Sequence, residues 1–169
     1  MKRTHRLVLC ALFAALTCVA TLTLQMPSPT GGYCNLGDCV ILLGAFFLPP
    51  LGALAAGGIG AMLADLLLGF AVYAPATLGI KALLALTAAL LFRALREKTV
   101  FFALLTACLC GEAVMVAGYF LFESGLYGAA AAAQSLLMTN LPQAALAVVS
   151  AMALYGLFYR TQKGRTLHV

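Results

Sequence analysis

The sequence predicts an all-α integral membrane protein, a bundle of six transmembrane helices with both termini in the cytoplasm. Of its 169 residues, 64% are hydrophobic and only 9% are charged, whereas about a quarter of the residues in a soluble domain are charged. A transmembrane helix needs ~20 apolar residues, so six spans leave almost no room for an aqueous domain. We therefore expect residues 1–169 to form a single domain within the lipid bilayer.

Prolines and breaks in hydropathy divide the first part of the chain into three apolar segments. The first, Leu7–Leu24, ends at the proline-rich stretch Met26–Pro29. A cleaved signal peptide is the alternative for this segment, but the apolar run is long and has no clear small-x-small cleavage site. The second segment, Leu36–Leu48, is short for a span, so we expect it to borrow residues from the preceding loop. The third, Leu51–Phe70, is rich in glycine.

Three further segments complete the six predicted spans. The fourth, Pro75–Leu95, begins with a proline, which suits the first turn of a helix because that turn needs no backbone N–H donor there. The fifth is Val100–Phe122 and the sixth is Ser135–Tyr159. The alanine run Ala129–Ala133 is either a short separate helix or the opening of the sixth span.

The distribution of basic residues supports six spans. With a cytoplasmic N-terminus, three inside regions hold nine of the ten Lys and Arg residues, and the three outside loops hold none: Lys2, Arg3, Arg6, Arg93, Arg96, Lys98, Arg160, Lys163 and Arg165. This pattern follows the positive-inside rule, and a count of five or seven spans would break it. Because these residues are scattered along the membrane edges, they do not indicate a nucleic-acid partner.

Two polar islands interrupt the apolar sequence, at Gly31–Asp38 and Tyr73–Lys81. Lipid cannot satisfy polar side chains, so polar groups at this depth must face a cavity or one another. Further polar residues recur at helical spacing in the fifth and sixth spans, and most of the set converges on the outer half of the bundle. We expect these residues to form a ligand pocket: Tyr33, Asn35, Asp38, Tyr73, Thr77, Lys81, Glu112, Tyr119, Glu123, Asn140 and Gln143.

Some of these polar residues, and Asp65 near them, are equally able to stabilise the bundle without contacting a ligand. Asp65 lies near the outer end of the third span, and it is able to form a buried ion pair with Lys81. Any single tyrosine is equally able to anchor a helix at the membrane interface. Cys34 and Cys39 flank the outer loop, and their spacing alone does not decide whether they form a disulfide.

Two rows of small residues lie on single helix faces. Ala11 and Ala15, near the cytoplasmic end of the first span, are one turn apart and permit the close approach of another helix. By itself this pattern is weak, because alanine-rich spans produce it by chance. The row Gly58, Ala61 and Asp65 on the third span is more typical of close packing inside the bundle.

The chain offers little for enzyme chemistry. It has no Gly-Lys-Ser/Thr phosphate-binding motif, so it cannot use ATP through that loop. Its two histidines, His5 and His168, lie at the ends of the sequence, away from the intramembrane carboxylates. We therefore expect no catalytic residues, no metal and no cofactor.

Taken together, these motifs resemble the S components of energy-coupling-factor (ECF) transporters, small membrane proteins that capture vitamins. The resemblance covers most of the first half and rests on Ala11–Leu16, Gly31–Asp38, Gly57–Gly69 and Tyr73–Lys81. In the second half it is limited to the layout of the spans and to Asn140. It is closest to the branch associated with riboflavin, hydroxymethylpyrimidine or pyridoxine-like ligands.

The resemblance implies a six-helix vitamin-binding subunit in a prokaryotic plasma membrane, with its site near the outer face under a lid from the first loop. It also implies partners on separate chains: a transmembrane coupling protein, which would dock on Ala11 and Ala15, and two ATPases. The chain contains no tryptophan, which tilts the expected ligand toward a small pyridine or pyrimidine. Two alternatives remain: a stand-alone secondary transporter or channel with Glu112 and Lys81 as a coupling pair, and an assembly subunit without a ligand.

Overall fold

The computed structural model describes residues 3–28, 30, 33–97 and 99–165, the last six of them by backbone alone. Lys2, Gly31, Gly32, Lys98 and His168, which entered the predictions above, lie outside the described residues. The elements are, in chain order, α1 (Arg3–Thr23), β1 (Met26–Pro27), β2 (Tyr33–Cys34), α2 (Gly37–Phe47), α3 (Pro50–Leu68), α4 (Ala74–Leu95), α5 (Val100–Tyr127), α6 (Ala129–Ser135), the π-helical segment η1 (Leu136–Asn140) and α7 (Leu141–Arg165).

Five helical stretches in the described part of the chain are long and apolar enough to cross a membrane: α1, α3, α4, α5 and the continuous helix Ala129–Tyr159. Large apolar side chains such as Leu51, Leu67 and Leu121 point outward from them. The prediction of an all-α membrane bundle is therefore confirmed. The remaining predicted span, Leu36–Leu48, corresponds to α2, which has 11 residues and a length of ~16 Å at 1.5 Å per residue. The six-span count stays a prediction.

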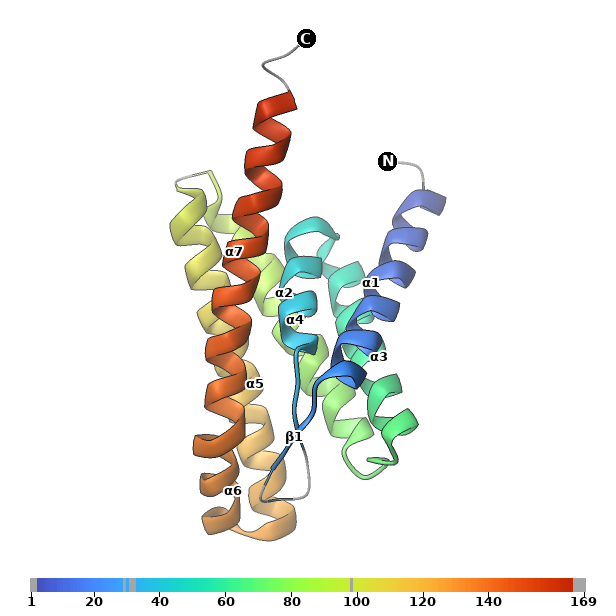
Figure 1. The fold of residues 1–169 in the computed structure, drawn as a ribbon, viewed down its shortest axis with the longest axis vertical. Helices are drawn as coiled ribbons and strands as arrows, with labels where there is room; N and C mark the ends of the chain where they lie inside the picture. Colours follow the sequence, from blue (N-terminus) through green and yellow to red (C-terminus); the bar gives the residue numbers. More distant parts are fainter. Residues whose placement is uncertain (1–2, 29, 31–32, 98, 166–169) are drawn as a thin grey trace.

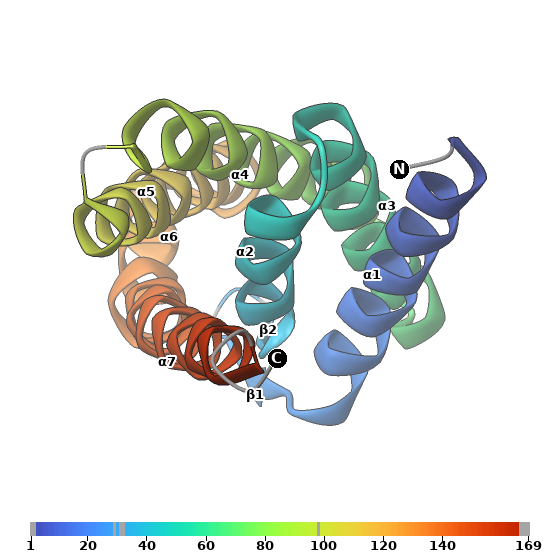
Figure 2. The same ribbon diagram turned by 90° about the horizontal axis from the view of Figure 1, so that it is seen from above.

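Helix α2 forms the centre of the bundle. Figure 2 shows it surrounded by the other helices, and it contacts α1, α3, α4 and α7. Nine of its 11 residues are buried, and Leu42 at its middle is completely enclosed. At its C-terminal end, the guanidinium of Arg93 donates hydrogen bonds to the carbonyls of Ala45 and Leu48. Arg93 thereby satisfies backbone acceptors that a helix end leaves free.

Prolines set several helix boundaries, as the sequence predicts, and a glycine sets one that it does not predict. Pro50 opens α3 and Pro75 lies in the first turn of α4, while Gly69 ends α3 in a left-handed conformation with φ 84°. The alanine run is the opening of the last membrane helix. Ala129 begins α6, which continues through η1 into α7.

Small residues let α3 pack closely on its neighbours. A Cβ atom at Gly60 would lie 2.9 Å from the Cβ of Thr17 on α1, a distance that side-chain carbons do not adopt. Gly58, Ala61 and Asp65 are all buried, so the prediction that this row packs inside the bundle is confirmed.

The two ends of the bundle differ in character. The beginning of α1 and the end of α7 lie at one end, which we call the terminal end, and the β1–β2 hairpin and the α5–α6 turn lie at the other, the hairpin end (Figure 1). The basic side chains Arg93 and Arg96 belong to the last turn and C-cap of α4, at the terminal end. The side of the membrane that each end faces remains a prediction.

Candidate ligand-binding site

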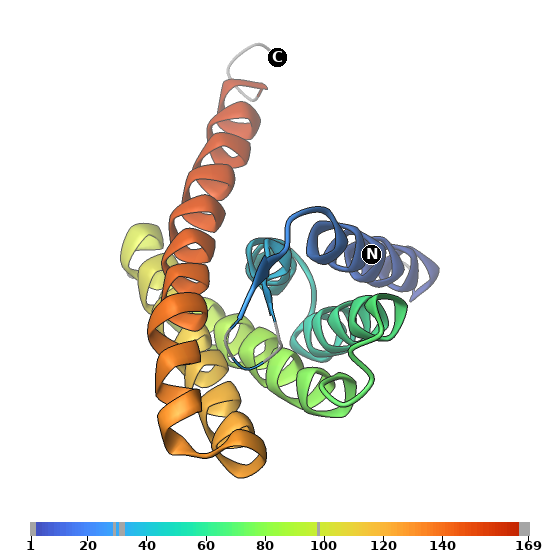
Figure 3. The ribbon, with the colours of Figure 1, turned by 60° about the horizontal axis from the view of Figure 1, so that its bottom comes forward.

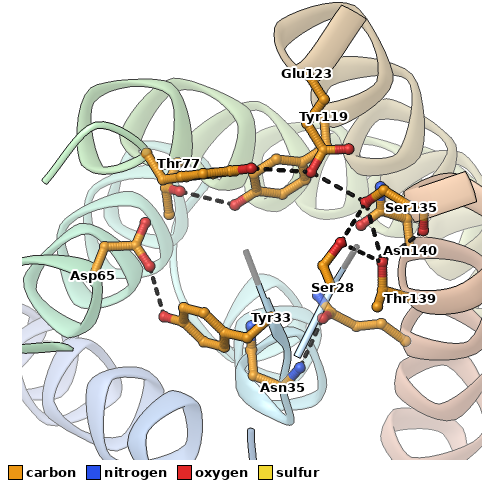
Figure 4. A pocket seen from close by; sticks show the side chains of 12 residues that line it. Ser28, Tyr33, Asn35, Asp65, Thr77, Tyr119, Glu123, Ser135, Thr139 and Asn140 are labelled. Atoms are coloured by element: carbon orange, nitrogen blue, oxygen red, sulfur yellow. Dashed lines mark hydrogen bonds between the residues drawn. The ribbon is translucent and has the colours of Figure 1, made fainter. Parts of the chain in front are cut away.

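A cavity lies at the hairpin end, between the β1–β2 hairpin and the ends of α3, α4, α5 and the α6–α7 helix (Figure 4). Figure 3 shows the backbone with this end of the bundle turned forward. Polar and tyrosine side chains line it: Ser28, Tyr33, Asn35, Asp65, Tyr73, Thr77, Tyr119, Glu123, Ser135, Thr139, Asn140 and Gln143. Its free volume is ≈ 30 Å³, room for about two water molecules. A vitamin-sized molecule enters only if this space widens.

The hairpin borders the cavity, and we call it the lid after the role that the resemblance implies for the first loop. Its two short strands pair antiparallel, with Met26 opposite Cys34 and Pro27 opposite Tyr33. Asn35 follows the second strand and accepts a hydrogen bond from the backbone N–H of Gly37 at 2.8 Å, which shapes the entry into α2. Helix α2 begins at Gly37, so the lid ends two residues earlier than the predicted polar island.

Side chains on and facing the lid latch it to the surrounding helices. The Tyr33 hydroxyl donates to Asp65 Oδ1 on α3 at 2.6 Å, and burial raises the pKa of Tyr33, which keeps this donor protonated. The backbone N–H of Asn35 donates to Gln143 Oε1 on α7 at 2.8 Å. The Tyr73 hydroxyl, next to the start of α4, donates to the backbone carbonyl of Thr30 at 3.1 Å. Hydroxyl groups of the loop form further hydrogen bonds to α5, α6 and η1.

The second group of latches is a hydroxyl cluster around Glu123. Thr30 Oγ1 donates to Glu123 Oε1 at 2.7 Å, and Ser135 Oγ donates to the same oxygen at 3.1 Å. Ser28 Oγ lies 2.8 Å from Ser135 Oγ, and Thr139 completes the cluster. The η1 segment follows Ser135 and contains Thr139. Such π-helical segments are frequent at functional sites.

Several polar atoms of the cavity wall have no partner. Among the described residues, Asp65 Oδ2, Glu123 Oε2 and Asn140 Nδ2 are buried without a hydrogen bond, although each residue lines the cavity. Buried polar groups are normally satisfied, and an unsatisfied one costs roughly 1–3 kcal/mol. These three atoms are therefore the natural contacts for a bound molecule.

A buried ion pair lies outside the cavity wall. The ammonium group of Lys81 on α4 donates to both carboxylate oxygens of Asp38 on α2, at 2.6 and 2.8 Å, and Gln143 on α7 donates to Asp38 Oδ2. Lys81 thus pairs with Asp38, which settles the open question of an Asp65–Lys81 pair against that pairing. Its ammonium also lies 5.2 Å from the centre of the Tyr119 ring.

Glu112 lies apart from the cavity in the middle of α5. Its side chain is buried, and neither carboxylate oxygen has a hydrogen-bond partner within the described structure. It lines an open apolar groove between α5 and α7, together with Val116, Ala144 and Val148. The alternative of a Glu112–Lys81 coupling pair gains no support, since the ammonium of Lys81 is engaged by Asp38.

The sequence also left undecided whether Cys34 and Cys39 form a disulfide and what Ala11 and Ala15 on α1 pack against. Cys34 and Cys39 are both free thiols, so they do not form a disulfide. Ala11 and Ala15 are exposed on α1 and therefore do not pack inside the bundle.

The structure brings most of the predicted site residues together. Tyr33, Asn35, Tyr73, Thr77, Tyr119, Glu123, Asn140 and Gln143 line the cavity, whereas Asp38, Lys81 and Glu112 lie outside its wall. The sequence prediction missed Ser28, Ser135 and Thr139, and it left Asp65 open between a structural role and the pocket. Ser135 and Thr139 are spaced i, i+4 just before Asn140, which is a helical stripe, but small hydroxyl residues in apolar helices so often bond their own backbone that this signal is weak.

The fold and the site together define an all-α membrane protein with a polar cavity at one end of its helical bundle. Comparison with known families identifies the class: the family model for the S component of ECF-type riboflavin transporters matches residues 1–160. The chain belongs to this family of vitamin-uptake proteins.

Comparison with solved structures agrees on the fold. The chain is similar to a structure described as "Structure and mechanism of the S component of a bacterial ECF transporter", with a TM-score of 0.66 and 17% sequence identity, over 99% of this chain and 100% of that one. No curated protein matches the chain.

Proposed function

We propose that this protein is the high-affinity vitamin-binding subunit of an ECF-type importer in a prokaryotic plasma membrane. It binds a small aromatic heterocycle, such as pyridoxine, hydroxymethylpyrimidine or riboflavin, in the cavity under the β1–β2 hairpin. A transmembrane coupling protein and two ATPases on separate chains supply the energy for uptake. The observation that carries the proposal is the closed cavity whose wall combines tyrosine rings with buried, unpartnered polar atoms.

The chemistry of the wall supports a heterocyclic ligand. Tyr33, Tyr73 and Tyr119 offer flat apolar surfaces for a ring, and Asn140 offers a free donor. Membership of the S-component family supports a vitamin as the ligand. It also supports a role in binding for this chain, with ATP hydrolysis carried out by other chains. The proposed topology has six passes and cytoplasmic termini, in which the basic terminal end faces inward and the cavity opens outward.

Co-purification tests this proposal directly. The tagged full-length protein is expressed with its candidate coupling protein and ATPases, purified in mild detergent, and the bound small molecules are identified by mass spectrometry. We expect a stable complex with the three partners and one heterocyclic vitamin in near-stoichiometric amount. A protein that binds no vitamin and associates with no ATPase would contradict the assignment.

The hydrogen bonds between the lid and the helices allow a test of whether the lid opens in the empty protein. Thr30→Val removes the hydroxyl that holds the lid to the Glu123 carboxylate, and hydrogen bonds to charged groups contribute about 1.5–3 kcal/mol. We expect backbone hydrogen exchange in residues 33–36 to speed up about tenfold or more in the empty protein, and a saturating ligand to slow it again. Thr23→Val is the matched control, because that exposed hydroxyl bonds only within α1. Equal protease sensitivity of the loop with and without ligand would count against a lid.

A further inference from the structure

We propose that the solute is a cation: an aromatic heterocycle carrying a protonated amino group or a positively charged ring nitrogen, bound between Asp65 and Glu123. This inference rests on the proposed function and narrows its ligand class. Riboflavin, hydroxymethylpyrimidine and pyridoxine have no net charge at neutral pH, so the inference selects a cationic relative such as pyridoxamine in their place. Figure 4 shows the two carboxylates on opposite sides of the cavity, and each of them both holds the lid and presents a free oxygen.

The buried acidic side chains outnumber the buried basic ones in the described structure. Four of the five acidic residues of the sequence are buried in the described structure, Asp38, Asp65, Glu112 and Glu123, and the described residues give them one buried cation, Lys81. Lys81 is already paired with Asp38. Of the remaining three, Glu112 lies apart from the cavity and Asp65 and Glu123 line it. A buried carboxylate without a counter-charge either takes up a proton or pairs with a cation, and a positively charged solute would supply that pair for Asp65 and Glu123.

Acidic side chains also outnumber basic ones among the described residues of the cavity wall. The described residues that line it include two carboxylates and no Lys, Arg or His. Asp65 and Glu123 are only 4% and 2% exposed, so solvent screens their charges poorly. A phosphorylated or carboxylated solute would meet repulsion from both sides, whereas a cation would pair with both.

Among the described residues, the unpartnered atoms of the cavity wall include both acceptors and a donor. Asp65 Oδ2 and Glu123 Oε2 are acceptors, and Asn140 Nδ2 is a donor. This arrangement is complementary to a ring that presents N–H donors on two sides and one acceptor. The ring of Tyr73, which also lines the wall, adds a favourable electrostatic surface for a cation.

Binding of four probes to the purified full-length protein tests the charge class. Thiamine and pyridoxamine are cationic, riboflavin is neutral, and pyridoxal 5′-phosphate is anionic. We expect a cationic probe to bind at least about tenfold more tightly than the neutral and anionic probes, as measured by titration calorimetry. Asp65→Asn and Glu123→Gln, which keep the shape and the lid acceptor, should each weaken cation binding about tenfold or more. Glu97→Gln is the control, because this exposed acidic residue lies at the opposite end of the bundle.

The possible outcomes separate this inference from the proposed function. Tight binding of riboflavin that is unchanged in Asp65→Asn and Glu123→Gln would overturn the charge class and leave a vitamin-binding subunit. If no probe binds and the purified protein contains no heterocycle, the proposed function fails and the charge class fails with it. Selective loss of cation binding in both variants would establish the inference.

Discussion

Replacing Ala11 and Ala15 together by tryptophan is expected to abolish ATP-driven uptake while ligand binding stays unchanged. Helices in lipid associate by close packing, so small residues decide which faces another helix can approach. Both alanines are exposed on α1, and the apolar side chains of Val8 and Leu12 beside them are exposed as well. Two indole rings on this surface would hold the coupling protein away. Uptake of radiolabelled vitamin into cells, with binding to the purified protein measured in parallel, checks this result.

A matched pair of alanines provides the control. Ala113 and Ala117 on α5 have the same spacing and are also exposed, and Figure 2 shows α5 on the other side of the bundle from α1. The Ala113→Trp/Ala117→Trp variant should still associate with the coupling protein. If Ala11→Trp/Ala15→Trp still co-purifies with its partners, the docking surface lies elsewhere. Joint loss of ligand binding and thermal stability would mean that the tryptophans disturb the bundle itself.

The second large effect is expected from Lys81→Met, which leaves the Asp38 carboxylate buried without its cation. Asp38 is 0% exposed and Lys81 is 2% exposed, and removing one partner of a buried ion pair costs about 3–5 kcal/mol. We expect a marked fall in the thermal unfolding temperature of the empty protein in detergent. The Asp38→Asn/Lys81→Met double variant should recover much of this loss, because no unpaired charge remains.

The comparison of single and double variants also decides the role of Lys81. A double variant that recovers stability and retains ligand binding would make the pair a structural link between α2 and α4. A stable Lys81→Met protein with binding weakened by about 2 kcal/mol or more would instead support the sequence-based prediction of a direct ligand contact. The two results differ both in the thermal stability of the empty protein and in the affinity for the ligand, so the two measurements are made on the same variants.

Hydropathy and proline positions predict most of the helix boundaries correctly. The predicted span Val100–Phe122 begins where α5 begins, and Pro75–Leu95 differs from α4 by one residue at its start. The sequence leaves the beginning of the last helix open, because an alanine run suits both a short helix and the start of a long one. In the structure the alanine run continues into the last helix through the π-helical segment η1. No residue pattern in the sequence predicts that segment.

Partners across the bundle are harder to predict than positions along a helix. Helical spacing places Thr77 and Lys81 on one face, but it does not say which carboxylate faces Lys81. Asp38 and Lys81 are 43 residues apart in the sequence, and their pairing depends on how α2 packs against α4. The same holds for Thr30 and Glu123, whose contact depends on the path of the loop over the end of α5.

The shortness of α2 explains why this bundle contains a site at all. A helix that crosses the ~30 Å hydrocarbon core needs ~20 residues, and α2 has 11. As the central helix, it leaves the missing turns as unfilled space at the hairpin end, and the lid and cavity occupy that space. The surrounding helices therefore act as a cup, with the loop residues before α2, among them Tyr33 and Asn35, on one of its walls. Changes in the length or side chains of the loop before Gly37 can then alter what the cup holds without altering how the cup sits in the membrane.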